Sequence, residues 1–230
     1  MTPWKTLATI ATSEGPLELR QRGAREFLIV IGGRVLMTSS DRRSEEALAT
    51  LACAKLPRGA PRVLIGGLGM AYTLRAALDA LPAGAEVTVA ELTPEVEAWC
   101  RGPLAALTDR AIADPRVRVV IDDVARVIAS APRGHYDAIV LDLYEGPHAA
   151  TQRADDAFYG RAAIERSRAA LVTGGVLAVW SEDPDEPFAR RLAAGGFAVS
   201  VHRLGAARTH VVYVGRREER AARKPVARRS

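Results

Sequence analysis

The fold of this chain is decided by residues 62–91, which read RVLIGGLGMAYTLRAALDALPAGAEVTVAE. A short apolar run enters the glycine turn at residues 66–69, a helix-forming segment follows, and a second apolar run ends on Glu91. Glycines let a backbone bend sharply and approach a ligand closely. The free N–H groups at the start of the next helix point at the same place. The pattern therefore predicts a nucleoside-binding unit: strand, glycine turn, helix, strand and carboxylate.

The carboxylate of this unit lies where a ribose diol would need an acceptor. Glu91 is 22 positions beyond Gly69, at the end of the second strand. The dinucleotide form of the motif has Gly or Ala three positions after Gly69, where this chain has Tyr72. S-adenosylmethionine or a related mononucleoside therefore fits better than NAD or FAD. We predict that the nucleoside is bound by the turn and the strand end: Gly66, Gly67, Leu68, Gly69, Glu91 and Leu92.

Apolar runs alternate with helix-forming segments through the rest of the chain. Further strands are predicted at 117–121, 138–141, 176–180, 197–201 and 209–214, and helices at 42–56, 124–131, 155–171 and 186–194. This alternation indicates an α/β fold, a doubly wound, mostly parallel Rossmann-like sheet of seven strands covered on both faces. Ser39 or Ser40 is predicted to cap the helix that begins at Arg42.

Composition divides the chain into three parts. Short β-prone runs between glycine turns predict a β meander in residues 1–40, before a nucleoside-binding catalytic domain in residues 41–215. Residues 216–230 hold seven basic residues and two acidic ones, which equals the whole chain's formal net charge of +5. We predict that this segment is a basic disordered tail. The folded part is then neutral, which argues against a nucleic-acid partner.

The remaining composition excludes several classes of protein. No apolar run approaches the length that a membrane span requires. Two cysteines make neither a disulfide framework nor a metal cluster, and the four histidines show no metal-ligand spacing. We expect a cytoplasmic protein without a metal.

Acidic residues follow two more of the predicted strands, and ligands in such sheets bind beyond these strand ends. Asp122, Asp123 and Val124 follow the strand at 117–121; Asp123 is a candidate acceptor for the adenine amino group and also a candidate helix cap. Asp142 and Glu145 follow the strand at 138–141 and would form a negative pocket that holds an ammonium group and takes its proton. Tyr144 is placed to shape this pocket or to pack on the surface.

These residues resemble the spermidine synthase family, the polyamine aminopropyltransferases that share the class I methyltransferase fold. The resemblance covers roughly residues 25–200 and includes the glycine loop, Glu91, Asp123 and the run YDAIVLDLYEGP at 136–147, which keeps both catalytic-loop acids at the family's spacing. It implies aminopropyl transfer from decarboxylated S-adenosylmethionine to an amine, with Asp142 as the base and Glu145 as its partner. The chain departs from the family in two places: its glycine loop has no acid, and Ser44-Glu45-Glu46 does not match the polyamine channel.

Two other functions stay open on the sequence. The absent loop acid favours methyl transfer from intact S-adenosylmethionine to a small molecule on the same fold. A degenerate fold that binds RNA or a protein through its basic tail is the non-enzymatic alternative. For the enzyme, we expect a small-molecule amine or similar acceptor, no membrane contact, and a homodimer as an assembly that the sequence leaves open.

Overall fold

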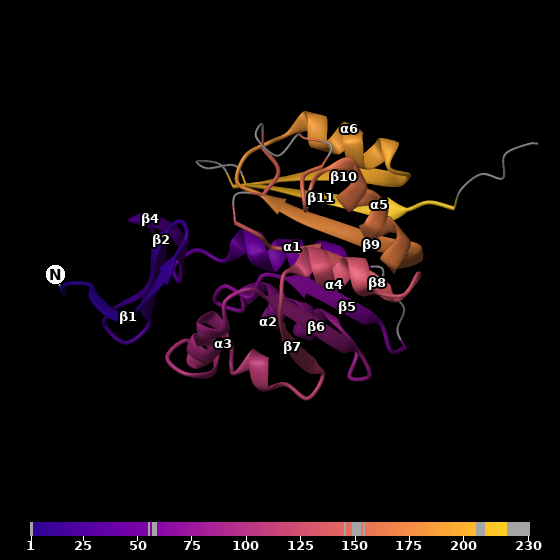
Figure 1. The fold of residues 1–230 in the computed structure, drawn as a ribbon. Helices are drawn as coiled ribbons and strands as arrows, with labels where there is room; N and C mark the ends of the chain where they lie inside the picture. Colours follow the sequence, from indigo (N-terminus) through magenta and orange to yellow (C-terminus); the bar gives the residue numbers. More distant parts are fainter. Residues whose placement is uncertain are drawn as a thin grey trace, which may run out of the picture.

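The computed structural model of the chain describes residues 2–54, 56, 59–144, 146–148, 153, 155–205 and 210–219. They form a small antiparallel sheet followed by a larger domain built on a seven-stranded sheet (Figure 1). None of the helices in these residues is long and apolar enough to cross a membrane.

The N-terminal sheet is the predicted meander. Strands β1 (Lys5–Thr12), β2 (Gly15–Arg22), β3 (Glu26–Ile31) and β4 (Arg34–Thr38) pair in sequence order, each antiparallel to the next. Gly32 and Gly33 both have positive φ, which the tight turn between β3 and β4 requires. Figure 1 shows this sheet beside the larger domain, connected to it through helix α1 (Arg43–Cys53).

The larger sheet has the strand order β10-β11-β9-β8-β5-β6-β7. Its five parallel strands are β5 (Arg62–Gly66), β6 (Glu86–Glu91), β7 (Val117–Ile121), β8 (Tyr136–Leu141) and β9 (Leu171–Ser181). Strand β11 (His210–Arg217) lies antiparallel between β9 and β10 (Phe197–Leu204). The order reverses at β5 and β8, so ligands are expected at the carboxyl ends of these two strands.

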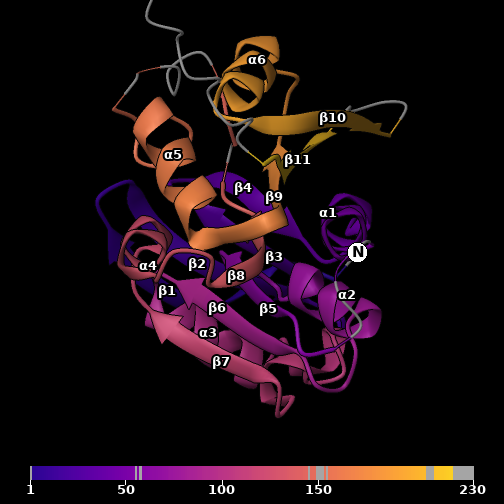
Figure 2. The same ribbon diagram turned by 90° about the vertical axis from the view of Figure 1, so that its right-hand side faces the viewer.

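Helices cover both faces of this sheet, as the apolar strands require. Val63 and Ile65 of β5 join one apolar core and Leu64 joins the other, because successive side chains point to opposite faces. The first core includes residues of α1, α2 (Tyr72–Ala80) and α3 (Pro94–Arg101). The second includes residues of α4 (Val124–Ser130), α5 (Arg161–Ala170) and α6 (Glu186–Ala194). Figure 2 shows α1 and α2 on the opposite side of the sheet from α4 and α5. Two short 3₁₀ turns, Ala105–Leu107 and Ala111–Ala113, precede β7. The predicted doubly wound fold is confirmed.

The predicted starts of α5 and β9 are wrong. Helix α5 starts at Arg161 rather than Asp155, because the carboxylate of Asp156 accepts the N–H groups of Phe158 and Tyr159 and holds a turn there. Strand β9 starts five residues before the predicted Val176 and runs through Gly174 and Gly175.

The expected cap of α1 is also wrong, because Arg42 stands at the cap position and makes no side-chain cap bond. The hydroxyl of Ser39 is used elsewhere: it accepts the N–H of Phe27 and donates to the carbonyl of Arg25.

The basic segment predicted to begin at residue 216 starts too early. Arg216 and Arg217 are the last residues of β11, paired with Ala198 and Phe197 of β10. Their guanidinium groups donate to the carbonyls of Gly174 and Leu171, so strand pairing and side-chain bonds both hold them on the sheet. Residues 220–230 of the predicted tail lie outside the described residues.

Candidate functional site

The glycine turn lies directly against the end of β8. Gly67 has φ +87°, and a Cβ on it would overlap the backbone carbonyl oxygen of Asp142. A Cβ on Gly66 would lie 2.8 Å from Cγ2 of Val124 at the start of α4. The backbone N–H of Asp142 donates to the carbonyl of Gly66 at 2.9 Å. The glycines are therefore required by the fold itself, and they bring the turn, α4 and Asp142 together.

The N-terminal sheet reaches the same turn through Met37 of β4. The N–H of Met70 donates to Sδ of Met37 at 3.2 Å, and a Cβ on Gly69 would lie 3.0 Å from this sulfur. Leu68 and Met70 are both buried. The glycine turn thus has apolar side chains at the place where the spermidine synthase family, which the sequence resembles, has an acid.

Glu91 connects the glycine turn to the start of α3. Its Oε2 accepts the N–H of Leu68 at 2.9 Å and its Oε1 accepts the N–H of Thr93 at 2.8 Å. The side chain is only 8% exposed, and this burial raises its pKa, although the backbone N–H bonds act in the other direction. A carboxylate has about four lone-pair sites, so Glu91 keeps acceptor capacity that a ribose diol needs. Leu92, the next residue, is 71% exposed.

The acids after β7 have structural partners. The carboxylate of Asp123 accepts the N–H of Ala125 at 2.8 Å and caps α4. The carboxylate of Asp122 accepts the N–H of Asp123 at 2.8 Å and lies 3.3 Å from a guanidinium nitrogen of Arg126. The backbone N–H of Asp122 donates to the carbonyl of Glu91 at 3.1 Å. The end of β7 therefore lies beside Glu91, the candidate acceptor for the ribose hydroxyls. The capping role of Asp123 is confirmed, and its role toward adenine stays a prediction.

Asp142 is the most strongly perturbed carboxyl group of this cluster. Burial and the negative charge of Glu45 raise its pKa to about 7, against the hydrogen bond that Thr73 supplies. The Oγ1 of Thr73, in the first turn of α2, donates to Oδ2 of Asp142 at 2.5 Å. A carboxylate that titrates near neutral pH is suited to accept a proton from a bound ammonium group.

The predicted acidic loop also includes Tyr144 and Glu145. Tyr144 is 41% exposed, and the guanidinium of Arg34 lies over its ring, 4.7 Å from the centroid. Arg34 also forms an ion pair with Glu182 at 2.9 Å. Tyr144 therefore contacts the first residue of β4. Glu145 lies outside the described residues.

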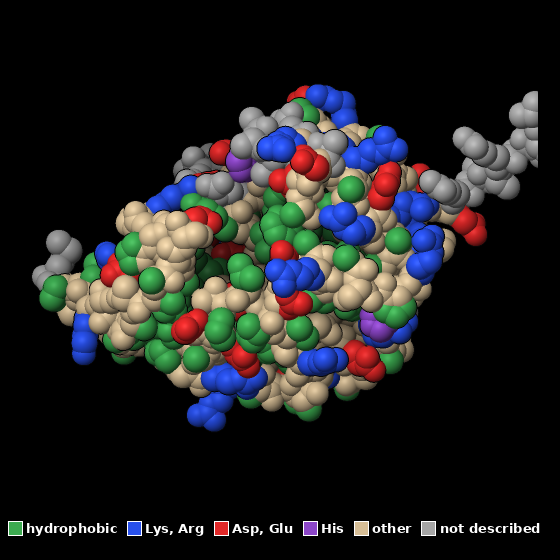
Figure 3. Space-filling view, viewed as in Figure 1, with side chains coloured by type: hydrophobic (Ala, Val, Ile, Leu, Met, Phe, Trp, Pro, Cys, Tyr) green, Lys and Arg blue, Asp and Glu red, His purple; other side chains and the backbone are tan. Residues whose placement is uncertain are grey.

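Two residues near Asp142 were not among the predicted site residues. Thr73 is a hydroxyl in the first turn of the helix after the glycine loop, a position that the strand-end argument did not cover. Glu45 lies on α1, about a hundred residues before Asp142 in the sequence. Figure 3 shows a hollow between the N-terminal sheet and the larger domain, with acidic side-chain atoms at its bottom.

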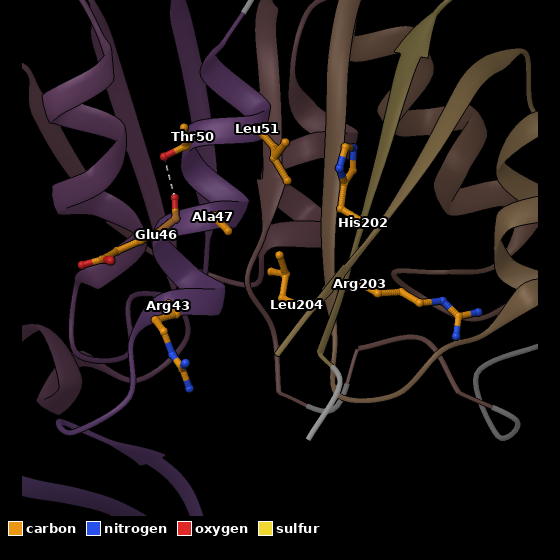
Figure 4. A pocket seen from close by; sticks show the side chains of 8 residues that line it. All are labelled: Arg43, Glu46, Ala47, Thr50, Leu51, His202, Arg203 and Leu204. Carbon is orange, nitrogen blue, oxygen red and sulfur yellow. Dashed lines mark hydrogen bonds between the residues drawn. The ribbon is translucent and has the colours of Figure 1, made fainter. Parts of the chain in front are cut away.

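A second concavity lies between α1 and β10, away from the predicted residues. This groove has a volume of about 600 Å³, and Figure 4 shows its lining side chains, among them Glu46 of α1 and His202 of β10. None of the predicted site residues lines it. Among the described residues, no group of three or more His, Cys, Asp or Glu side chains is placed to bind a metal ion.

The strand order and the glycine turn beside Glu91 define the class I methyltransferase type of nucleoside-binding fold. No family model matches the sequence. The chain is, however, 31% identical over 195 residues to polyamine aminopropyltransferase 2 of Streptomyces coelicolor (strain ATCC BAA-471 / A3(2) / M145). The match covers 79% of this chain and 33% of the relative, so the chain spans about a third of the length of the curated relative that it matches.

Solved spermidine synthases share the fold. The spermidine synthase of Thermotoga maritima superposes with a TM-score of 0.75 at 19% identity, over 92% of this chain and 72% of that one. A spermidine synthase in complex with the transition state analogue AdoDATO gives the same score and identity, over 92% and 73%. A probable spermidine synthase of Corynebacterium glutamicum ATCC 13032 gives 0.66 at 19% identity, over 91% and 79%. The chain is thus related in sequence to a polyamine aminopropyltransferase and has the fold of the spermidine synthases.

Proposed function

We propose that this protein is a transferase that moves an aminopropyl group from decarboxylated S-adenosylmethionine to a small amine, with Asp142 as the base. The observation that carries the proposal is the position of Asp142: it lies against the glycine turn, and its pKa is raised to about 7. The sequence relative supports the same chemistry, since it is named a polyamine aminopropyltransferase.

In the proposed reaction, Asp142 first holds the acceptor as an ammonium ion and then takes one of its protons. The freed nitrogen lone pair attacks the carbon next to the sulfonium, a new N–C bond forms, and the C–S bond electrons pass to sulfur. Methylthioadenosine leaves as a neutral thioether. Catalysis here is mainly positioning, because the sulfonium is already a good leaving group.

The nucleoside part of the donor is assigned to the turn and the neighbouring strand ends. Glu91 would accept the ribose hydroxyls, and Gly66, Gly67, Leu68 and Gly69 would form the floor beneath them. Leu92, Asp122, Asp123 and Val124 would surround the adenine. Tyr144 and Glu145 stay proposed members of the acceptor side.

Methyl transfer from intact S-adenosylmethionine is the second candidate. The observation in its favour is the apolar glycine turn, in which buried Leu68 and Met70 offer no carboxylate to a donor ammonium group. The sequence relative favours the first candidate.

Calorimetry with the two sulfonium compounds, side by side, separates the candidates. Aminopropyl transfer predicts tighter binding of the decarboxylated compound and, with an amine present, release of methylthioadenosine measured by mass spectrometry. Release of S-adenosylhomocysteine instead would overturn the proposal in favour of methyl transfer.

The setting of the reaction is also proposed. Cys53 and Cys100 are both buried free thiols, in keeping with a reducing cytoplasm. A homodimer is the proposed assembly, to be checked by sedimentation velocity.

A further inference from the structure

Arginine side chains gather at the amino end of strand β9. The carbonyl of Leu171, the first residue of β9, accepts a hydrogen bond from Nη1 of Arg217 on β11. Because β9 runs parallel to β8, this strand end is opposite to the one that Asp142 follows. Figure 1 shows the end of β11 on the side of the larger domain away from the N-terminal sheet. The arginine cluster is therefore separate from the candidate site described above.

Arg168 brings a second guanidinium group to the same place. It lies on α5, three residues before Leu171. Its Nη2 donates to the carbonyl of Glu218 at 2.9 Å, and its Nε donates to the carbonyl of Gly196 at 3.4 Å. The carbonyl of Gly196 also accepts the N–H of Glu218, at 3.2 Å. Arg168 is thus bonded to the residue that directly follows Arg217 in the chain.

Arg133 approaches the cluster from the turn between α4 and β8. The next residue, Gly134, lies so close to β9 that a Cβ on it would be 4.0 Å from the carbonyl oxygen of Leu171. This is the same oxygen that Arg217 binds. The Arg133 side chain is exposed, so it can reach a ligand at this surface without a change in the fold.

The positive charges of the cluster are not neutralised by the protein. None of the three guanidinium groups forms an ion pair with an acidic side chain among the described residues. The acids that follow Arg217 in the chain, Glu218 and Glu219, are both exposed. Burial, and after it the charges of Arg168 and Arg133, lower the pKa of the Arg217 guanidinium. The fold therefore holds like charges together, which an anion would relieve.

Donors of the cluster are also left unused by the fold. The Nε of Arg217 is buried and has no hydrogen-bond partner within the part of the chain that the structure describes. Buried N–H groups are normally hydrogen-bonded, so an acceptor is lacking at this place. A guanidinium carries five N–H donors, arranged in a planar fork that matches the oxygens of phosphate or carboxylate. The cluster thus has both the charge and the donors of an anion-binding site.

We propose that Arg133, Arg168 and Arg217 together bind a phosphate group. A phosphate ester carries about two negative charges near neutral pH and three acceptor oxygens, which suits three guanidinium groups better than a single carboxylate does. The group can belong to a small phosphorylated molecule or to the backbone of a nucleic acid, and the compact arrangement around one carbonyl favours the small molecule. This inference is independent of the proposed aminopropyl transfer.

Arg133→Gln is the decisive variant, because this exposed side chain forms no hydrogen bond or ion pair with another described residue. Calorimetry with pyrophosphate at constant ionic strength measures binding while the screening of charges stays equal. We expect the dissociation constant to rise about 10-fold, within the range of a hydrogen bond to a charged group. Arg168→Gln should weaken binding at least as much.

Arg161→Gln is the matched control, since it makes the same change of charge on α5. The Arg161 side chain is 80% exposed and pairs with Glu165 at 3.0 Å, away from the cluster. Its affinity for pyrophosphate should stay within twofold of the wild type. Absence of pyrophosphate binding in the wild type, or equal affinities of the wild type, Arg133→Gln and Arg168→Gln, would overturn the proposal.

Other anions identify the group and its source. Citrate carries several negative charges on carboxylates alone, so binding as tight as that of pyrophosphate overturns the assignment to phosphate. A short single-stranded RNA that binds more tightly than pyrophosphate, and loses affinity in Arg133→Gln, assigns the phosphate to a nucleic acid. RNA affinity that is equal in wild type and variant assigns it to a small molecule. The basic residues at 220–230 are unaltered in this variant, so the difference reports the cluster alone.

Discussion

The two halves of the candidate site are built in opposite ways. On the nucleoside side, both oxygens of Glu91 accept backbone N–H groups, and the glycine turn that supplies one of them is held by the fold. On the acceptor side, Asp142 receives one hydroxyl hydrogen bond, and burial and the charge of Glu45 raise its pKa to about 7. The first half makes its hydrogen bonds within the fold, whereas the second holds a carboxyl group whose charged form the fold disfavours. The contrast suggests that Glu91 has a structural as well as a proposed binding role, whereas the proposed role of Asp142 is chemical.

The largest effect is expected from Asp142→Asn, which removes the proposed base and leaves the nucleoside side untouched. Turnover should fall by about 10²- to 10⁴-fold, the usual contribution of a general base. The dissociation constant for methylthioadenosine should change less than twofold. Steady-state assays and calorimetry on the same preparation check both numbers, and full activity in the variant would remove Asp142 from the mechanism.

Gly67→Ala tests whether the close contact between the glycine turn and the backbone of Asp142 is needed for the stability of the fold. The added Cβ overlaps the carbonyl oxygen of Asp142 at a φ of +87°, so we expect a loss of about 2–4 kcal/mol in the free energy of unfolding. Gly59→Ala is the control, because a Cβ there meets nothing within 4 Å. Urea denaturation measures both variants; equal stability would mean that the turn can move away from β8.

The raised pKa of Asp142 should appear as a pH dependence of the free energy of unfolding. The pKa of Asp142 is about 7 in the folded protein, above its ordinary value of 3.8, so the folded state favours the protonated form. This contribution is complete below about pH 4 and is lost as the pH rises through 7. Asp142→Asn should therefore gain stability over the wild type as the pH rises from 4 to 8, reaching on the order of 4 kcal/mol at the upper end.

Asp114→Asn gives the opposite sign and serves as the comparison for this stability measurement. The hydrogen bond from Arg116 lowers the pKa of Asp114 to about 2, so the charged form stabilises the fold above the ordinary pKa. This variant should lose stability at neutral pH and approach the wild type as the pH falls toward 2. Thermal melts across this range follow both variants; a flat difference for Asp142→Asn would show that its carboxyl group is not strained.

The smallest effect is expected at Glu91, whose carboxylate already accepts backbone N–H groups of the fold. Glu91→Gln keeps one acceptor oxygen and loses the other, so nucleoside binding should weaken by about 1–2 kcal/mol. The limiting rate with saturating donor should change little, because the proposed base Asp142 is unaltered. Titration of methylthioadenosine into the variant checks the affinity, and an unchanged value would place the ribose elsewhere.

The sequence predicted those parts of the molecule that depend on neighbours along the chain. The strand, turn and helix around Gly66–Gly69 follow from local patterns, and so does the meander before residue 40. The start of α5 was missed because Asp156 forms a turn that resembles the first residues of a helix.

The acceptor side was harder to predict because its contacts join distant segments. Thr73 meets Asp142 across 69 residues, and Met37 meets Met70 across 33. No local spacing marks such pairs. Glu45 lay in a stretch that the family pattern did not match, and its contribution to the raised pKa of Asp142 depends on the folded chain.

The tight approach of Gly67 to the backbone of Asp142 has a consequence for how such an enzyme changes over evolution. The proposed base and the glycine turn are fixed to each other through main-chain atoms, since the N–H of Asp142 also donates to the carbonyl of Gly66. Substitutions elsewhere around the site can therefore occur while these two groups keep their alignment.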